Sequence, residues 1–218
     1  ISAELSDRLT GQRFGKIFSI SKFALVIDFR LSSGQYLYLS AQPNSPRIFL
    51  VKRKLKTLEK QSTGQSSFVS FLRKRAANAV VEKISKEPNE RILLISLKST
   101  NEFGLAEQFT LIVQLTGRSS NLFLLDNDLI ILDSLRETFG EGQAIGSKYI
   151  NPVRVDKQRD SQKLEAFPQG DFETLSEALD VFHKGKDAED RFNSIVQSAK
   201  ISLNRETKKR RRLRAKKN

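Results

Sequence analysis

The chain has 218 residues, 38% of them hydrophobic, and carries a formal net charge of +13. This length suits one domain or one domain with an appendage, and 15 phenylalanines permit a sizeable core. The absence of cysteine excludes a disulfide framework and thiolate metal sites, and a single histidine excludes four-ligand zinc sites and Ser–His or Cys–His catalysis. We therefore expect no enzyme, no metal and no cofactor.

The elements predicted for the first part of the chain are one helix followed by strands. Apolar residues recur on one face of residues 1–9, which predicts a short helix. Alternating or continuous apolar runs then predict strands, and the polar, basic stretch 52–67 predicts a loop. The four strands are expected at residues 13–20, 24–31, 35–40 and 47–51.

The same order then repeats. Residues 68–77 have helical spacing of their apolar side chains, and further β-prone runs follow. A helix followed by strands, found twice, predicts an α+β fold of two similar halves that form a mixed β-sandwich or barrel. The later strands are expected at residues 80–85, 91–97, 107–115, 121–126 and 129–135.

The last part of the chain changes character. We expect the α+β domain to span residues 1–152, a polar linker 153–171 and a helical arm 172–218. Apolar residues at alternating spacings of three and four indicate either one long helix or the first arm of an antiparallel coiled coil. A simple helix packed on the domain is the alternative.

The most informative stretch is the turn Thr116–Asn121 between two apolar runs, 109–115 and 122–125. It presents Gly117, Arg118, two serines and an asparagine, which suit a phosphate or carboxylate because Arg is a fork of donors and Gly lets backbone N–H groups approach. The same residues are common in ordinary hairpin turns, so chemistry alone favours a solvated turn.

Further basic residues lie beside turns or on the second predicted helix, and the chain end is strongly basic. If these side chains converge on one face, they form a surface that follows phosphates. With no Trp and few Tyr, base stacking would have to come from Phe or Arg. The candidates are Arg47, Arg73, Lys74 and Arg91 in the body and Lys208, Lys209, Arg210, Arg211, Arg212 and Arg214 in the tail, where the alternative for each is a solvated charge.

Five motifs occur in the order found in one family. They are the run from Ser40 to Ile48, FVSFLRK from residue 68, NERIL from 89, QLTGRSSN from 114 and GSKYINP from 146. Together they resemble the N-terminal domain of the NFACT family, often labelled fibronectin-binding protein A, and residues from 172 resemble the start of its coiled-coil arm. The resemblance covers nearly the whole chain.

This resemblance implies a fold like the N-terminal domain of formamidopyrimidine-DNA glycosylases. It also implies a cytoplasmic ribosome-associated quality-control factor that binds tRNA and the large ribosomal subunit with a stalled nascent chain, and supports template-free alanine tailing. Gly117, Arg118 and Asn121 would share an RNA-facing surface with Glu90 and Arg91, where the family usually has Asp-Arg. The alternatives are a fibronectin- or fibrinogen-binding surface adhesin and a glycosylase-like DNA-binding protein.

Several features that could be expected are not seen in the sequence. No transmembrane stretch or signal peptide is visible, so we expect no membrane association. The chain begins at Ile1 and contains no methionine, which leads us to expect a missing N-terminal stretch and missing methionines. The family's helix-hairpin-helix module and C-terminal domain are also not seen, which indicates a fragment or a divergent paralogue.

Overall fold

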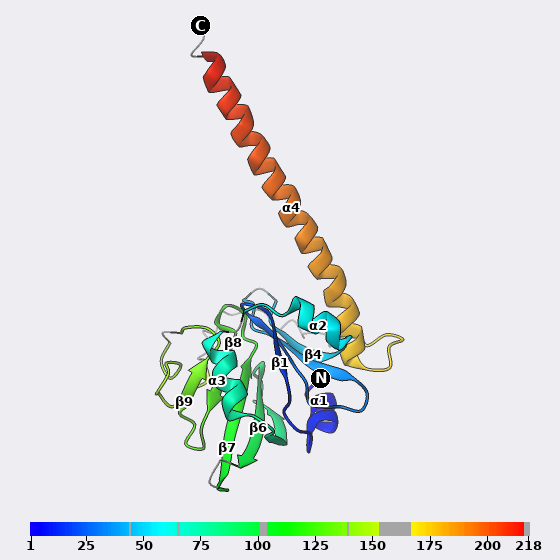
Figure 1. Cartoon of the computed structure of the whole chain (residues 1–218), viewed down its shortest axis with the longest axis vertical. Helices are drawn as coiled ribbons and strands as arrows, with labels where there is room; N and C mark the ends of the chain where they lie inside the picture. Colours follow the sequence, from blue (N-terminus) through cyan, green and yellow to red (C-terminus); the bar gives the residue numbers. More distant parts are fainter. Residues whose placement is uncertain (44, 65, 101–103, 139, 153–166, 216–218) are drawn as a thin grey trace. The chain divides into compact units, whose positions relative to one another are not determined.

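A computed structural model describes residues 1–43, 45–64, 66–100, 104–138, 140–152 and 167–215, with side chains up to Lys208. The chain divides into two compact units, Ile1–Glu177 and Ala178–Asn218. The first unit contains two antiparallel sheets and three short helices, and the second consists of helix (Figure 1). The α+β class predicted from the sequence is confirmed.

The first sheet is a simple meander of four antiparallel strands, in the order β1-β2-β3-β4. Their central residues are mostly buried, and β2 is buried along its whole length. Short turns connect β1 to β2 and β2 to β3, which is what an antiparallel meander permits. The strands are β1 (Ile17–Ser21), β2 (Ala24–Ile27), β3 (Gln35–Ser40) and β4 (Arg47–Lys52).

The second sheet is a meander of five antiparallel strands, in the order β5-β6-β7-β8-β9. Its centre is the long pair β6–β7, in which Ile92 lies opposite Gln114, and β8 continues the sheet with Asn121 opposite the same Gln114. This register places the start of β6 beside the β7–β8 turn. The strands are β5 (Val80–Lys86), β6 (Ile92–Thr100), β7 (Ala106–Gln114), β8 (Asn121–Leu125) and β9 (Ile131–Ser134).

One hydrophobic core joins both sheets and two helices. The helix α1 (Ser2–Leu9) contributes Leu5 and Leu9, and α3 (Ser67–Arg75) contributes a buried face that includes Phe68 and Leu72. The side-chain oxygen of Ser66 caps α3 by accepting a hydrogen bond from the backbone N–H of Val69. These residues pack with apolar side chains from both sheets. The predicted repetition of helix and strands is therefore present.

The prediction of a loop over 52–67 was wrong, because this stretch contains the helix α2 (Leu55–Gln61). Leu58 is buried there with Phe18 and Val26. One buried leucine in a two-turn helix produces too little periodicity to be recognised. Several strand ends were also predicted too long: β1 begins at Ile17 rather than at residue 13, and β2 ends at Ile27.

The second unit consists mainly of α4 (Leu175–Ala215). Phe192, Ile195 and Leu203 are each about two-thirds exposed (66%, 68% and 68%). The long helix was predicted, whereas a pairing partner for it stays a prediction. The predicted linker falls largely on residues 153–166, outside the described residues. Among the helices described, none combines the length and apolar character needed to cross a bilayer.

Candidate nucleic-acid interface

The β7–β8 turn is a short 3-10 helix, Gly117–Ser119, held by its own hydroxyl groups. Gly117 has φ +71°, a backbone conformation that glycine adopts without strain. Ser120 Oγ donates to the carbonyl oxygen of Gly117 at 2.6 Å, and Ser119 Oγ lies 2.9 Å from Thr116 Oγ1. These hydroxyls therefore stabilise the turn itself, and the exposed side chain of Arg118 is its main external donor. We call residues 116–121 the hairpin tip.

Arg91 lies beside the hairpin tip because β6 begins opposite the end of β7. The backbone N–H of Leu115 donates to the carbonyl oxygen of Arg91 at 2.8 Å. A Cβ atom placed on Gly117 would lie 4.0 Å from Arg91 Nη2, which is ordinary van der Waals contact, so this guanidinium lies next to the tip. Both Arg91 and Arg118 are exposed. The structure thus brings together three of the residues predicted for the RNA-facing surface.

Glu90 occupies a tight turn that precedes Arg91. Its backbone N–H donates to the carbonyl oxygen of Glu87 at 3.2 Å, and Asn89 has φ +56°. The Glu90 side chain is half-buried. Burial raises the pKa of the Tyr149 phenol most, and the charges of Glu87 and then Glu90 raise it further.

A buried polar cluster supports the hairpin tip from behind. Gln114 is 0% exposed, and its Nε2 donates to the carbonyl oxygen of Ser119 in the tip. Its Oε1 accepts hydrogen bonds from Tyr149 Oη at 2.8 Å and from Gln143 Nε2 at 3.1 Å. Buried polar groups are costly unless they are paired, so this network fixes the position of each member. It connects the GSKYINP motif to the tip.

Asn121 is an internal member of the hairpin tip, with 0% exposure. Its Nδ2 donates to the carbonyl oxygen of Arg136 at 2.8 Å, and its Oδ1 accepts from the backbone N–H groups of Arg136 and Leu122, both at 2.9 Å. The Asn121 side chain therefore uses both its oxygen and its nitrogen for hydrogen bonds with the protein backbone. The geometry therefore makes Asn121 a residue that positions the tip.

Arg136 continues the basic surface from the tip towards the first sheet. Its Nη1 donates to the carbonyl oxygens of Arg118 and Ser120, the first at 3.1 Å. Its guanidinium lies 5.5 Å from the ring centre of Phe23, and Lys22 Nζ lies 5.4 Å from the same ring. Such distances are typical of cation–π contacts. The surface therefore contains four cations, Lys22, Arg91, Arg118 and Arg136, around the tip.

The sequence did not identify Lys22, Phe23 or Arg136 as candidates. Lys22 and Phe23 lie in the β1–β2 turn, more than 100 positions before Arg136. Contacts between sheets at such separation leave no local pattern in one sequence. A buried glutamine inside an apolar strand, as at Gln114, is the one available signal, since such a group needs internal partners.

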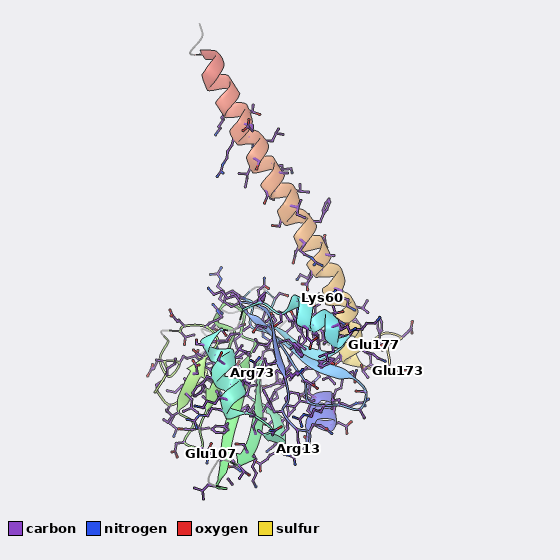
Figure 2. All side chains as sticks on the ribbon, in the orientation of Figure 1. Arg13, Lys60, Arg73, Glu107, Glu173 and Glu177 are labelled. Atoms are coloured by element: carbon purple, nitrogen blue, oxygen red, sulfur yellow. The ribbon has the colours of Figure 1, made fainter. Side chains whose placement is uncertain are left out.

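The remaining predicted residues lie elsewhere. Arg47 is buried, donates to Ser45 Oγ at 3.0 Å and lies 5.3 Å from the ring centre of Tyr38. Arg73, which projects from α3 in Figure 2, donates to the carbonyl oxygen of Ile17 at 3.0 Å. Lys74 is exposed on the same helix. Arg47 thus lies at the start of β4, and Arg73 and Lys74 lie on α3.

The predicted basic tail lies at the end of α4. Lys208 is exposed, whereas the side chains of Lys209, Arg210, Arg211, Arg212 and Arg214 lie outside the described ones. In the portion of the chain with described side chains, no group of three or more His, Cys, Asp or Glu residues is arranged to hold a metal ion.

Tyr149→Phe is expected to flatten the loss of stability at high pH. Burial raises the pKa of Tyr149 above its ordinary value of 10.0, and Glu87 and Glu90 raise it further. A raised pKa favours the neutral phenol in the folded state. The contribution of Tyr149 to stability is therefore fully present below about pH 10, the unfolded pKa, and is lost progressively as pH rises towards the raised folded pKa. Urea unfolding at pH 8 and 10.5 measures this. If the free energy of unfolding fell equally between these pH values in wild type and Tyr149→Phe, the prediction would be contradicted.

Comparison with known proteins agrees with this architecture. A family model described as NFACT N-terminal and middle domains matches residues 1–158. The Rqc2 homologue RqcH of Streptococcus pneumoniae is 28% identical over 225 aligned residues, covering 95% of this chain and 40% of that protein. RqcH of Bacillus subtilis is 30% identical over 135 residues, covering 61% of this chain and 23% of that protein. The chain thus spans less than half the length of these relatives.

Solved structures resemble about 70% of this chain. The N-terminal domain of the fibronectin-binding protein PavA from Streptococcus pneumoniae has a TM-score of 0.62 and 31% identity, covering 70% of this chain and 59% of that one. The N-terminal part of the fibronectin/fibrinogen-binding protein from Streptococcus suis has a TM-score of 0.61 and 29% identity, covering 71% and 59%.

Proposed function

Because the chain belongs to the NFACT family, we propose that it is an RNA-binding, non-enzymatic factor of ribosome-associated quality control. Its similarity to proteins named as Rqc2 homologues supports this role. The observation that carries the proposal for this chain is the convergence of Arg91 and Arg118 at the hairpin tip, next to Arg136. Exposed guanidinium groups held on a rigid turn suit the phosphates of a folded RNA such as tRNA.

The wider role follows the family resemblance. The proposed setting is cytoplasmic, on a large ribosomal subunit that carries a stalled nascent chain, with support for template-free addition of alanine. The proposed domain order is an NFACT domain over 1–152, a linker and a helical arm from residue 172. Exposed apolar side chains on α4 support a partner helix for that arm, because a single helix cannot bury them itself.

Arg91→Ala and Arg118→Ala are each expected to weaken tRNA binding about tenfold, the loss expected for one charge-assisted phosphate contact. Each should also lower the slope of log K against log salt by about 1. Fluorescence anisotropy with labelled tRNA at several salt concentrations measures both. Lys98→Ala is the matched control, because Lys98 is an exposed cation further along β6 that pairs with Glu82 at 3.7 Å.

Unchanged tRNA affinity in both arginine variants at near-physiological salt would overturn the proposed surface. A loss in Lys98→Ala equal to that in the arginine variants would indicate attraction by net charge alone.

A second candidate is binding of fibronectin, since solved structures similar to this chain are those of fibronectin-binding proteins. Immobilised fibronectin offers the direct test. Saturable binding of the chain that survives Arg91→Ala and Arg118→Ala, without tRNA binding by the wild type, would favour this candidate.

A further inference from the structure

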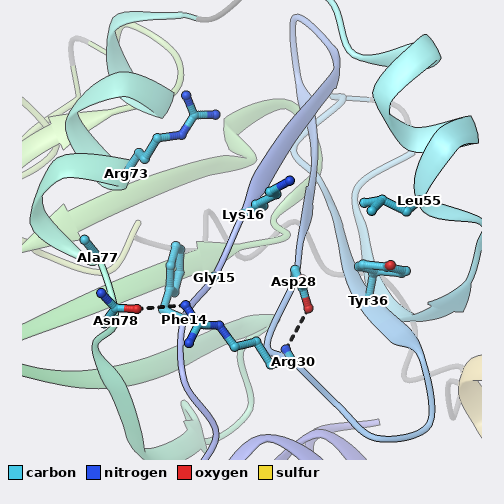
Figure 3. A pocket seen from close by; sticks show the side chains of 10 residues that line it. All are labelled: Phe14, Gly15, Lys16, Asp28, Arg30, Tyr36, Leu55, Arg73, Ala77 and Asn78. Carbon is cyan, nitrogen blue, oxygen red and sulfur yellow. Dashed lines mark hydrogen bonds between the residues drawn. The ribbon is translucent and has the colours of Figure 1, made fainter.

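A second possible binding place is a pocket of about 380 Å³ lined by residues from both halves of the domain. Lys16 enters it from the start of β1, Arg30 from the segment after β2 and Arg73 from α3 (Figure 3). None of the hairpin-tip residues lines it. Its volume is within the range of pockets that hold small molecules.

The charged groups that line the pocket have a positive balance. They are three cations, Lys16, Arg30 and Arg73, and one carboxylate, Asp28. Asp28 Oδ1 already accepts a hydrogen bond from the backbone N–H of Arg30 at 2.7 Å. Glu59 lies 3.9 Å from Lys16 Nζ, but both side chains are at least half exposed (50% and 68%), so this ion pair is weak and an anion can replace it.

The Arg30 guanidinium is held in place by its surroundings. Its Nη2 donates to Asn78 Oδ1 at 2.8 Å, as drawn in Figure 3. Arg30 has φ +56° and Asn78 φ +57°, a conformation that is uncommon for arginine and clusters at functional sites. A Cβ atom on Gly15 would lie 2.8 Å from the carbonyl oxygen of Asp28 and 3.5 Å from Arg30 Nε. Glycine at this position thus permits the close approach of both.

Arg73 is also held, because one of its N–H groups donates to the carbonyl oxygen of Ile17 at 3.0 Å. A guanidinium has five N–H donors, so each of these two arginines has further donors for a ligand. The pocket also has an aromatic and an aliphatic side chain in its wall, Tyr36 and Leu55. Tyr36 is half-buried, and Leu55 is 41% exposed. Cations beside an aromatic and an aliphatic surface are the arrangement that nucleotides require.

We propose that this pocket binds a nucleotide phosphate, with Arg30, Arg73 and Lys16 around the phosphate and Tyr36 and Leu55 against the rest of the nucleotide. The nucleotide comes either from free solution or from the 5′-phosphorylated end of an RNA strand. This site goes beyond the proposed tRNA surface and shares no residue with it.

Isothermal titration of the whole 218-residue chain with AMP tests the proposal, with two RNA tetranucleotides of one sequence, 5′-phosphorylated and 5′-hydroxyl, as further probes. Arg30→Gln is expected to weaken binding about tenfold or more, because it removes a charge-assisted contact. Ala77→Glu is expected to do the same without removing a hydrogen bond, since it adds a carboxylate to the pocket wall. Lys83→Gln, an exposed cation on β5, should bind like wild type.

The probes separate the two sources. AMP binding supports the free nucleotide, and binding of the 5′-phosphorylated tetranucleotide alone supports a strand end. Arg118→Ala should leave AMP binding unchanged, so failure of this pocket and failure of the tRNA surface are distinguishable. If Arg30→Gln does not fold, judged by thermal unfolding, Ala77→Glu decides. The proposal is overturned if neither AMP nor the 5′-phosphorylated tetranucleotide shows saturable binding. It is also overturned if Arg30→Gln and Ala77→Glu fold and bind these probes as tightly as wild type.

Discussion

Gly142→Ala is expected to lower the free energy of unfolding by about 2–5 kcal/mol, the sum of a left-handed backbone penalty and a steric overlap. Gly142 has φ +64°, and a Cβ atom there would overlap Cβ and Cγ1 of Ile150. Rotation of the Ile150 side chain can move Cγ1, but Cβ is attached to the backbone and cannot move without it. The loop must therefore shift as a whole.

Gly146→Ala is the matched control. Gly146 has φ +84° in the same loop, but no atom lies within 4 Å of its added Cβ. This variant carries only the backbone penalty, about 1–2 kcal/mol. Urea unfolding of wild type and both variants measures the difference, provided that the slopes with urea agree. Equal destabilisation by the two substitutions would show that the contact with Ile150 costs nothing.

The loop that contains Gly142 and Ile150 is connected to the candidate interface by hydrogen bonds. The backbone N–H of Ile150 donates to the carbonyl oxygen of Gly142 at 2.9 Å, and the Ile150 carbonyl oxygen accepts from Gln143 Nε2 at 3.1 Å. Gln143 and Tyr149 both bind Gln114, which holds the tip. A shift of this loop therefore reaches the hairpin tip through a chain of buried and partly buried hydrogen bonds. We expect Gly142→Ala to weaken tRNA binding beyond the effect of Gly146→Ala.

The main elements could be predicted from the sequence because most of them depend on local patterns. The β7–β8 hairpin was recognised from two strongly apolar runs around a polar turn, and the structure has strands there. The helix α2 was missed because Leu58 alone is buried in it. Boundaries such as that of β1 depend on partners: Gly15 pairs with Asp28 across the sheet, yet the regular strand begins only at Ile17.

The candidate site was predicted only in part, because its assembly depends on distant contacts. The β6–β7 register places the start of β6, and so Arg91, beside the tip that contains Arg118. Their common role in RNA binding stays a prediction. Arg136 reaches the tip and Phe23 through packing between sheets, for which the sequence contains no local pattern. Arg73 was grouped with the RNA-facing residues, but it lies in the pocket with Lys16 and Arg30.

Asn121→Ala is the second substitution expected to have a large effect. It removes an acceptor for two backbone N–H groups, those of Leu122 and Arg136, and the donor to the Arg136 carbonyl oxygen. Asn121 is 0% exposed, so these groups lose a partner where water does not readily replace it. The Arg136 carbonyl oxygen still accepts a hydrogen bond from Ser134 Oγ at 2.9 Å, so the main cost comes from the two backbone N–H groups. Each unsatisfied buried group costs about 1–3 kcal/mol, so we expect a loss of about 2–6 kcal/mol in the free energy of unfolding.

Asn151→Ala is the control, because Asn151 is exposed and such changes usually stay within about 0.5 kcal/mol. Asn121→Asp keeps an acceptor for both N–H groups but places a buried carboxylate oxygen against the Arg136 carbonyl oxygen, so it should also be less stable than wild type. If Asn121→Asp were as stable as wild type, the contact with the Arg136 carbonyl oxygen would not contribute to stability. If Asn121→Ala were also as stable, the internal role of Asn121 would be wrong.

Salt dependence distinguishes positioning by Asn121 from direct contact by Arg118. A residue that holds the tip changes tRNA affinity by misplacing other contacts, whereas a phosphate-binding cation also changes the number of counterions released. At a temperature where the variant remains folded, Asn121→Ala should weaken tRNA binding with little change in the salt slope. Arg118→Ala should lower the slope by about 1. A wild-type slope in Arg118→Ala would mean that its guanidinium does not contact phosphate, and would leave Arg91 and Arg136 to form the interface.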